Sequence, residues 1–199
     1  MNKKTLFKTI ALTIGSIAIM SATSHEAKAD DENTIKLELS TGGTVVIDLL
    51  PDIAPKGAER IRTLTKDGFY DGLTFHRVIT GFMAQTGDPT GTGMHGSNYP
   101  DLPAEFSNYA YKRGTVGMAR TYNIDSANSQ FFICFTDNGC SSLTGQYTVV
   151  GQVREGMEFV DAVAVGEPPA NPSKIVKMTV AGAEKKEAEE KAEKTGTAE

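Results

Sequence analysis

The segment Phe75–Asp88, FHRVITGFMAQTGD, concentrates side chains that could bind and polarise a ligand. An arginine carries five N–H donors and does not lose its proton, so Arg77 could donate hydrogen bonds but could not act as a general base. Phe82 and Met83 offer apolar surface, and Gln85 offers a donor and an acceptor. Taken singly, each residue also has a structural interpretation. Arg77 could form an exposed ion pair, Phe82 and Met83 could belong to the core, and Gln85 could be a neutral surface residue.

Conventional catalytic groups do not form a motif in this chain. His76 and His95 lack the spacing of metal ligands and have no cysteine cluster near them. The glycines of GDPTGTGMHG are not followed by the Lys-Ser/Thr pair of a phosphate-binding loop. Ser126 and Ser129 have no Gly-x-Ser-x-Gly setting. We therefore expect no metal and no cofactor.

Four motifs nevertheless follow one another in a characteristic order. They are FHRVITGFMAQTGD with the adjoining PTGTG, then GMAR at Gly117–Arg120, NSQFFI at Asn128–Ile133 and LTGQYTVVGQV at Leu143–Val153. Together they resemble the cyclophilin family of peptidyl-prolyl cis/trans isomerases, from about Asn33 to Ala183. The chain is most similar to the short bacterial periplasmic branch of that family.

This resemblance implies roles for individual residues. Arg77 takes the place of the catalytic arginine. The positions that line the proline pocket are filled by Phe82, Met83, Phe132 and Leu143. Gln85 and Gln130 match groove residues that bond the substrate backbone, and Ala119 matches the groove floor.

Three positions depart from the pattern of the larger family. Arg120 stands where an asparagine is often found, and Tyr147 stands where many eukaryotic members have a histidine. Ser142 falls where many members have a tryptophan. We expect Arg120 and Tyr147 to remain part of the substrate-binding groove.

These residues must be positioned by short strands and two helices. Alternating apolar residues predict strands over Thr34–Ser40 and Thr44–Leu49, joined by a Gly-Gly turn as a hairpin. A helix is expected to begin at Pro55 and to close by Gly68, and a second one to cover Met157–Val165. The further strands are expected over Leu73–Val78, Met83–Thr86, Thr115–Ala119, Gln130–Phe135, Thr148–Val153 and Ile175–Ala181.

Many short strands with two separated helices favour a mainly β fold, a closed antiparallel barrel capped by the helices. Periodicity alone leaves a sandwich open, and the resemblance implies a barrel of eight strands with a peptide groove on its outside. Neighbouring residues of a strand face opposite sides. His76 and Arg77 should therefore diverge, as should Phe131 and Phe132, and we interpret His76 as structural.

The two ends of the chain differ in composition from its middle. Residues 1–29 predict a cleaved signal peptide, because a lysine-rich start and a 12-residue apolar run lead to Ala27-Lys28-Ala29. The run is too short for a membrane anchor, which needs about 20 residues. Residues 30–183 form the expected isomerase domain. Residues 184–199 carry no Val, Ile, Leu or aromatic residue and predict a charged, disordered tail.

The expected location is therefore the periplasm, or the cell envelope or medium if no outer membrane is present. A net charge of −5 argues against nucleic acid as a partner. We expect a monomer, without a stable membrane anchor, that acts on proline-containing segments of exported proteins.

The two cysteines allow two interpretations. Cys134 lies in the apolar run FFICF and Cys140 lies in a polar loop. Export would permit a disulfide. From the sequence we prefer the interpretation that the two thiols are not bonded, with Cys134 as a small buried apolar residue and Cys140 as a free thiol in a loop.

The predicted activity is prolyl isomerisation, which needs no nucleophile because no covalent bond is broken. The main alternative is a non-catalytic module of the same fold that holds proline-containing segments as a chaperone or adaptor. An exported hydrolase has only isolated Ser and Asp residues to support it.

Overall fold

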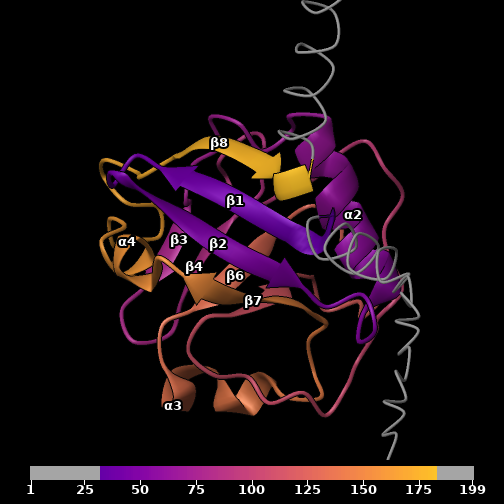
Figure 1. Cartoon of the computed structure of the whole chain (residues 1–199). Helices are drawn as coiled ribbons and strands as arrows, with labels where there is room; N and C mark the ends of the chain where they lie inside the picture. Colours follow the sequence, from indigo (N-terminus) through magenta and orange to yellow (C-terminus); the bar gives the residue numbers. More distant parts are fainter. Residues whose placement is uncertain (1–31, 183–199) are drawn as a thin grey trace, which may run out of the picture.

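The computed structural model describes residues 32–182, so the predicted signal peptide and the whole of the predicted tail lie outside the described residues. Eight strands form one curled antiparallel sheet in the order β3-β4-β6-β5-β7-β2-β1-β8 (Figure 1). The strands are β1 (Thr34–Leu39), β2 (Gly43–Leu49), β3 (Arg77–Ile79), β4 (Met83–Thr86), β5 (Thr115–Met118), β6 (Phe131–Cys134), β7 (Val149–Glu155) and β8 (Ile175–Val180). None of the helices between residues 32 and 182 combines the length and apolar character needed to cross a membrane.

The hairpin predicted at the start of the domain is confirmed. Ile35 of β1 pairs with Ile47 of β2, and Leu37 pairs with Val45. All four side chains are buried, so the apolar half of each alternating strand faces the core. Gly42 closes the turn with a φ of +99°, a left-handed conformation that favours glycine.

The first predicted helix is confirmed as α2 (Pro55–Lys66). Pro55 opens it in the first turn, where a missing N–H removes no helical hydrogen bond. Ala58, Ile61 and Leu64 are buried on one face, and the helix packs against β8 and β7.

The other helical segments differ from the prediction. The helix α4 (Met157–Asp161) is shorter than expected, because only Val160 of its five residues is buried and little apolar area supports a further turn. The short helices α3 (Asp137–Cys140) and η1 (Ser141–Leu143) were not predicted. Thr136 caps α3 by accepting a hydrogen bond from the Gly139 N–H at 3.0 Å.

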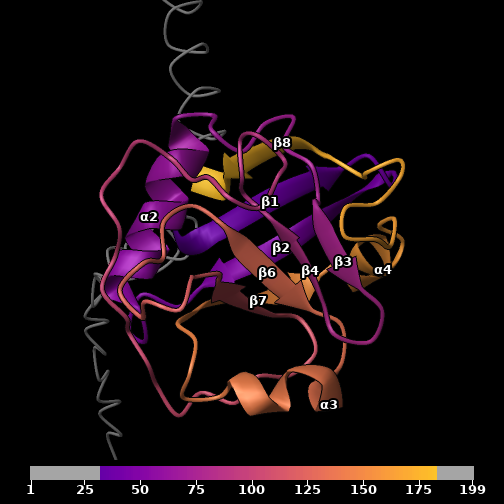
Figure 2. The same ribbon diagram turned by 180° about the vertical axis from the view of Figure 1, so that it is seen from behind.

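The prediction of a closed barrel is wrong: the strand ladder is open, with β3 and β8 at its edges. Figure 2 shows β3, β4 and β6 in front of β1 and β2, so the sheet curls around its core. The strand expected from Leu73 begins only at Arg77. The preceding residues meet the start of β8 through one isolated bridge, Thr74 with Lys174, in which the Phe75 N–H donates to the Ser173 carbonyl and the Ile175 N–H donates to the Leu73 carbonyl.

Strand β6 separates two clusters of apolar side chains. Phe131 and Ile133 belong to the main core inside the curled sheet. Phe132 and Cys134 belong to a second cluster with Met83, on the opposite face. Period-two alternation therefore buries β6 on both faces.

The preferred interpretation of two separate thiols is wrong, because Cys134 and Cys140 form a disulfide with a Cα–Cα distance of 6.2 Å. The expected burial of Cys134 is confirmed, and Cys140 is buried as well. Six residues of separation in sequence were not informative about this pair, because α3 folds Cys140 back onto β6. The bond thus ties the end of α3 to the sheet.

We expect reduction of this disulfide to lower the free energy of unfolding by about 2 kcal/mol, since it closes a short loop in the unfolded chain. Urea unfolding with and without dithiothreitol would measure the change. The matched control is the double variant Cys134→Ala/Cys140→Ala, whose stability should not respond to the reductant. An identical unfolding midpoint for the reduced and oxidised wild type would contradict the prediction.

Candidate active site

Nine of the ten predicted site residues line one cavity of about 200 Å³ on the outer face of the sheet. They come from six different parts of the chain, between β3 and the start of β7. The nine are Arg77, Phe82, Met83, Gln85, Ala119, Arg120, Phe132, Leu143 and Tyr147. The fold therefore brings together residues that are up to 70 positions apart in sequence.

Strand register creates the first row of this cavity. In the hairpin of β3 and β4, Arg77 pairs with Gln85, and Val78 pairs with Ala84. Val78 and Ala84 face the main core. Gln85 also pairs with Phe132 of β6. Because every second residue of a strand faces the same side, Arg77, Gln85 and Phe132 form a row across three strands.

The ring of Phe132 is packed between two tyrosines and is 4% exposed. It stacks on Tyr111 at a centroid distance of 5.8 Å and meets Tyr147 edge-on at 5.9 Å. The Tyr111 hydroxyl donates to the Thr148 carbonyl at 3.2 Å, which fixes the supporting ring. A Cβ on Gly117 would overlap both Tyr111 and Phe132. The glycine therefore makes room for the ring.

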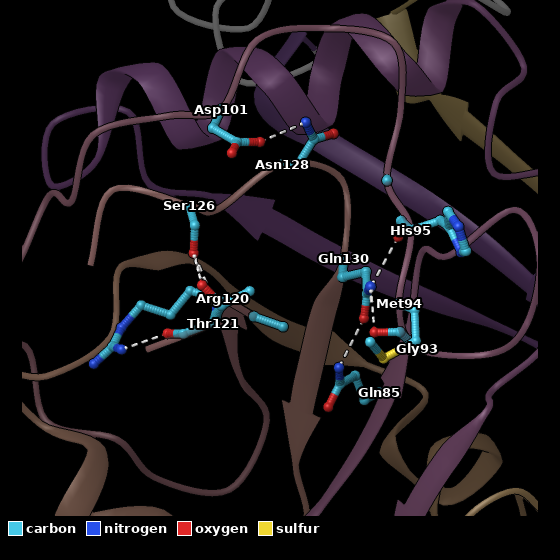
Figure 3. Close-up of a pocket in the computed structure, with 12 residues that line it drawn as sticks. Gln85, Gly93, Met94, His95, Asp101, Arg120, Thr121, Ser126, Asn128 and Gln130 are labelled. Carbon is cyan, nitrogen blue, oxygen red and sulfur yellow. Dashed lines mark hydrogen bonds between the residues drawn. The ribbon is translucent and has the colours of Figure 1, made fainter. Parts of the chain in front are cut away.

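A chain of hydrogen bonds orients the polar side chains of the site. Gln85 Nε2 donates to Gln130 Oε1 at 2.8 Å, and Gln130 Nε2 donates to the carbonyls of Gly93 and His95 at 3.0 and 2.8 Å (Figure 3). Because its amide N–H is used, Gln85 turns its oxygen toward Arg77, whose Nη1 lies 3.4 Å away. Both glutamine amides thus have a defined orientation.

A second cavity of about 270 Å³ adjoins the first, with which it shares Gln85, Ala119 and Arg120. Gln130, the tenth predicted residue, lies here (Figure 3). The other lining residues are Gly93, Met94, His95, Gly96, Asp101, Thr121, Ser126 and Asn128. All ten predicted residues therefore line two connected hollows of one surface.

Two of the positions that depart from the family pattern contact each other. The Arg120 guanidinium lies 4.5 Å from the centroid of the Tyr147 ring, within the range of a cation–π interaction. Arg120 also donates to the carbonyls of Gln146 and Thr121, at 3.0 and 2.9 Å. Ser142 is exposed and is not among the residues that line the cavity.

His76 and Arg77 differ in exposure, but both line one further hollow, so their expected divergence stays a prediction. His76 is 5% exposed, and burial lowers its pKa and favours the neutral imidazole. Within the described residues its ring nitrogens have no hydrogen-bond partner. Arg77 is half-exposed and faces the cavity. Over residues 32–182, no group of three or more His, Cys, Asp or Glu side chains is placed to hold a metal ion.

Sequence reasoning missed three contributors to the site. Tyr111 supports Phe132 from behind, Gly117 leaves room for that ring, and Glu167 pairs with Arg77 at 2.7 Å. Gly117 lies inside the motif GMAR, which gave a signal for it. Tyr111 and Glu167 lie outside the motifs, and only the folded chain brings them to the site.

Comparison with known proteins identifies the family. The family described as "Cyclophilin type peptidyl-prolyl cis-trans isomerase/CLD" matches residues 34–182. A "Probable peptidyl-prolyl cis-trans isomerase" of Brucella suis is 49% identical over 187 residues, covering 86% of this chain and 91% of the relative. The "Peptidyl-prolyl cis-trans isomerase B" of Bacillus subtilis is 38% identical over 130 residues, covering 65% and 89%.

A solved structure supports the same assignment. A cyclophilin type isomerase of Cryptosporidium parvum, determined in the presence of the dipeptide Ala-Pro, aligns with a TM-score of 0.67 and 26% identity, covering 74% of this chain and 98% of that one. The chain belongs to the cyclophilin-type peptidyl-prolyl cis-trans isomerase family. It is a peptidyl-prolyl cis/trans isomerase, which confirms the predicted enzyme over the binding-module and hydrolase alternatives.

A buried carboxylate anchors the loop that forms one wall of the second cavity. Asp88 is 1% exposed and accepts hydrogen bonds from the backbone and hydroxyl of Thr90 at 2.7 and 2.8 Å. Burial raises the pKa of Asp88, but these bonds and others from the backbone of His95 and Gly93 outweigh it and hold the pKa at about 2. The ionised carboxylate therefore stabilises the loop at neutral pH.

We expect Asp88→Asn to lower the free energy of unfolding by about 2 kcal/mol at pH 7. The folded-state pKa lies below the unfolded value of about 3.9. The carboxylate's contribution is thus fully present above that value and disappears as pH falls through about 2. Unfolding of wild type and variant between pH 7 and pH 2 would measure it, with the exposed Asp52→Asn as control. A stability difference that stays constant down to pH 2 would exclude this role.

Proposed function

We propose that Arg77 is the catalytic group of this isomerase and that the apolar part of the cavity beside it holds the substrate proline. One observation carries the proposal: the arginine lies at the wall of a cavity lined by Phe82, Met83, Phe132 and Leu143. An apolar cavity can bury a proline ring and leave the preceding residue outside, free to rotate.

The chemistry requires stabilisation of a twisted amide. Resonance in the planar peptide bond opposes rotation with a barrier of about 18–20 kcal/mol. In the twisted form the prolyl nitrogen loses conjugation and gains lone-pair character, so it accepts a hydrogen bond more readily. A guanidinium donor placed beside that nitrogen binds the twisted form better than either planar form, which is the condition for catalysis. The reaction is non-covalent.

The remaining predicted residues would hold the substrate backbone. Gln85 and Gln130 have orientations set by their mutual hydrogen bond, which favours a single geometry of the bound peptide. Ala119 presents little bulk where the two cavities meet. Arg120 and Tyr147, held against each other, would form the opposite side of the groove.

We further propose that the enzyme is exported and isomerises X-Pro bonds in exported proteins, which assists their folding. The lysine-rich start, the short apolar run and Ala27-Lys28-Ala29 support export. Uncatalysed X-Pro isomerisation takes about 10–100 s, slow enough to limit folding. The enzyme would act as a monomer of the bacterial periplasmic-like branch, without a cofactor.

We expect Arg77→Ala to lower kcat/KM for a proline-containing peptide by about 100-fold, because it removes the donor to the twisted amide. A protease-coupled isomerisation assay measures the rate, and thermal unfolding checks the fold. Arg154→Ala, which removes a half-exposed arginine that pairs with Asp48 at 3.1 Å, is the matched control. A variant within a few-fold of wild-type activity would mean that another group carries the catalysis.

We expect the full chain, produced in a Gram-negative host, to appear in the periplasmic fraction with Asp30 as its first residue. Small side chains at Ala27 and Ala29 suit cleavage after Ala29. Intact-mass measurement of the fractions tests this, with a chain lacking residues 1–29 as the cytoplasmic control. Uncleaved protein in the cytoplasm would contradict export, and uncleaved protein in the membrane fraction would indicate an anchor.

A further inference from the structure

The guanidinium of Arg77 has an acidic partner that no sequence motif indicates. Its Nε donates to Glu167 Oε2 at 2.7 Å, and the two side chains are 40% and 52% exposed. The residues are 90 positions apart, so this contact exists only in the folded chain.

The backbone fixes where Glu167 lies. The preceding residue, Gly166, forms two hydrogen bonds with Val78, the neighbour of Arg77 in β3: the Val78 N–H donates at 2.8 Å and the Val78 carbonyl accepts at 3.0 Å. Gly166 has a φ of +150°, and a Cβ there would overlap the backbone of Pro169. Glu167 is therefore held next to the strand that carries the arginine.

Glu167 is placed to act through Arg77 rather than on the substrate. It is not among the residues that line the predicted proline cavity. With Pro168 it lines another hollow, and Arg77 and Gln85 line both hollows. The arginine thus connects the carboxylate with the cavity.

The contacts of Arg77 hold its guanidinium from two directions. Glu167 engages Nε, while Nη1 lies 3.4 Å from Gln85 Oε1 and 4.0 Å from Met83 Sδ. Among the described residues Nη2 has no hydrogen-bond partner. A charge-assisted bond to Nε limits rotation of the planar group and leaves the Nη side available to a ligand.

Neither folding stability nor charge attraction accounts well for this pair. Exposed ion pairs contribute little to stability. A peptide amide carries no net charge, so the Glu167 carboxylate would not attract the substrate amide electrostatically. The pair can still affect the reaction by fixing the orientation of the Arg77 guanidinium, since small displacements of a catalytic group cause large losses of rate.

We propose that Glu167 is a positioning residue that holds the Arg77 guanidinium in the orientation needed to donate to the twisted prolyl amide. This inference rests on the proposed catalytic role of Arg77. A long, otherwise mobile arginine side chain becomes pre-organised through a residue supplied by the segment between α4 and β8.

The test compares Glu167→Ala, Glu167→Gln and Arg77→Ala by NMR exchange measurements on a proline-containing peptide, which separate turnover from binding. We expect Glu167→Ala to lower kcat by about five- to tenfold with little change in KM. Glu167→Gln keeps an oxygen acceptor for Nε and should recover most of the rate. In the Arg77→Ala background, Glu167→Ala should have no further effect, because the residue acts through the arginine.

The matched control is Asp161→Ala, which breaks the Arg113–Asp161 pair of 2.6 Å with similar exposure, 43% and 44%, away from the cavity. It should change activity by less than about twofold. Full activity of Glu167→Ala beside an inactive Arg77→Ala would overturn the positioning role alone. A rise in activity would overturn it too, since Glu167 would then compete with the substrate for the arginine. Full activity of Arg77→Ala would instead remove the proposed catalytic role.

Discussion

Pairing of β4 with β6 controls both the core and the cavity, because each strand is buried on two faces. Ala84 pairs with Ile133 on the inner face, and Gln85 pairs with Phe132 on the outer face. A shift of the pairing by one residue would move every side chain to the opposite face. Core packing therefore specifies the register strongly, and the outer residues of the site are positioned as a consequence.

The polar part of the site depends on contacts that span distant segments. Arg77 lies between Gln85 on the neighbouring strand and Glu167 from the segment before β8. Gln130 links Gln85 to the backbone of the loop that Asp88 anchors. Side chains with few accessible orientations lose less entropy when a ligand binds, which suits a reaction that relies on geometry alone.

The apolar wall depends on a different constraint. Leu143 belongs to η1, which follows α3 directly, and the Cys134–Cys140 disulfide ties α3 to β6. Phe132 and Cys134 are two residues apart on β6, so they share its outer face. The disulfide thus fastens the segment that carries Leu143 to the strand that carries Phe132. It keeps η1, a short helical turn that buries little apolar surface of its own, beside the cavity.

Periodic apolar residues in the sequence determined the hairpin of β1 and β2 and the helix α2, because these follow from local periodicity. Ordered motifs determined the family. Only the tertiary structure decided that the sheet is open, that the two cysteines are bonded and that Glu167 meets Arg77. The physical reason is common to all three: each depends on a distance in space between segments, and the sequence specifies such distances only through the packing of the whole chain.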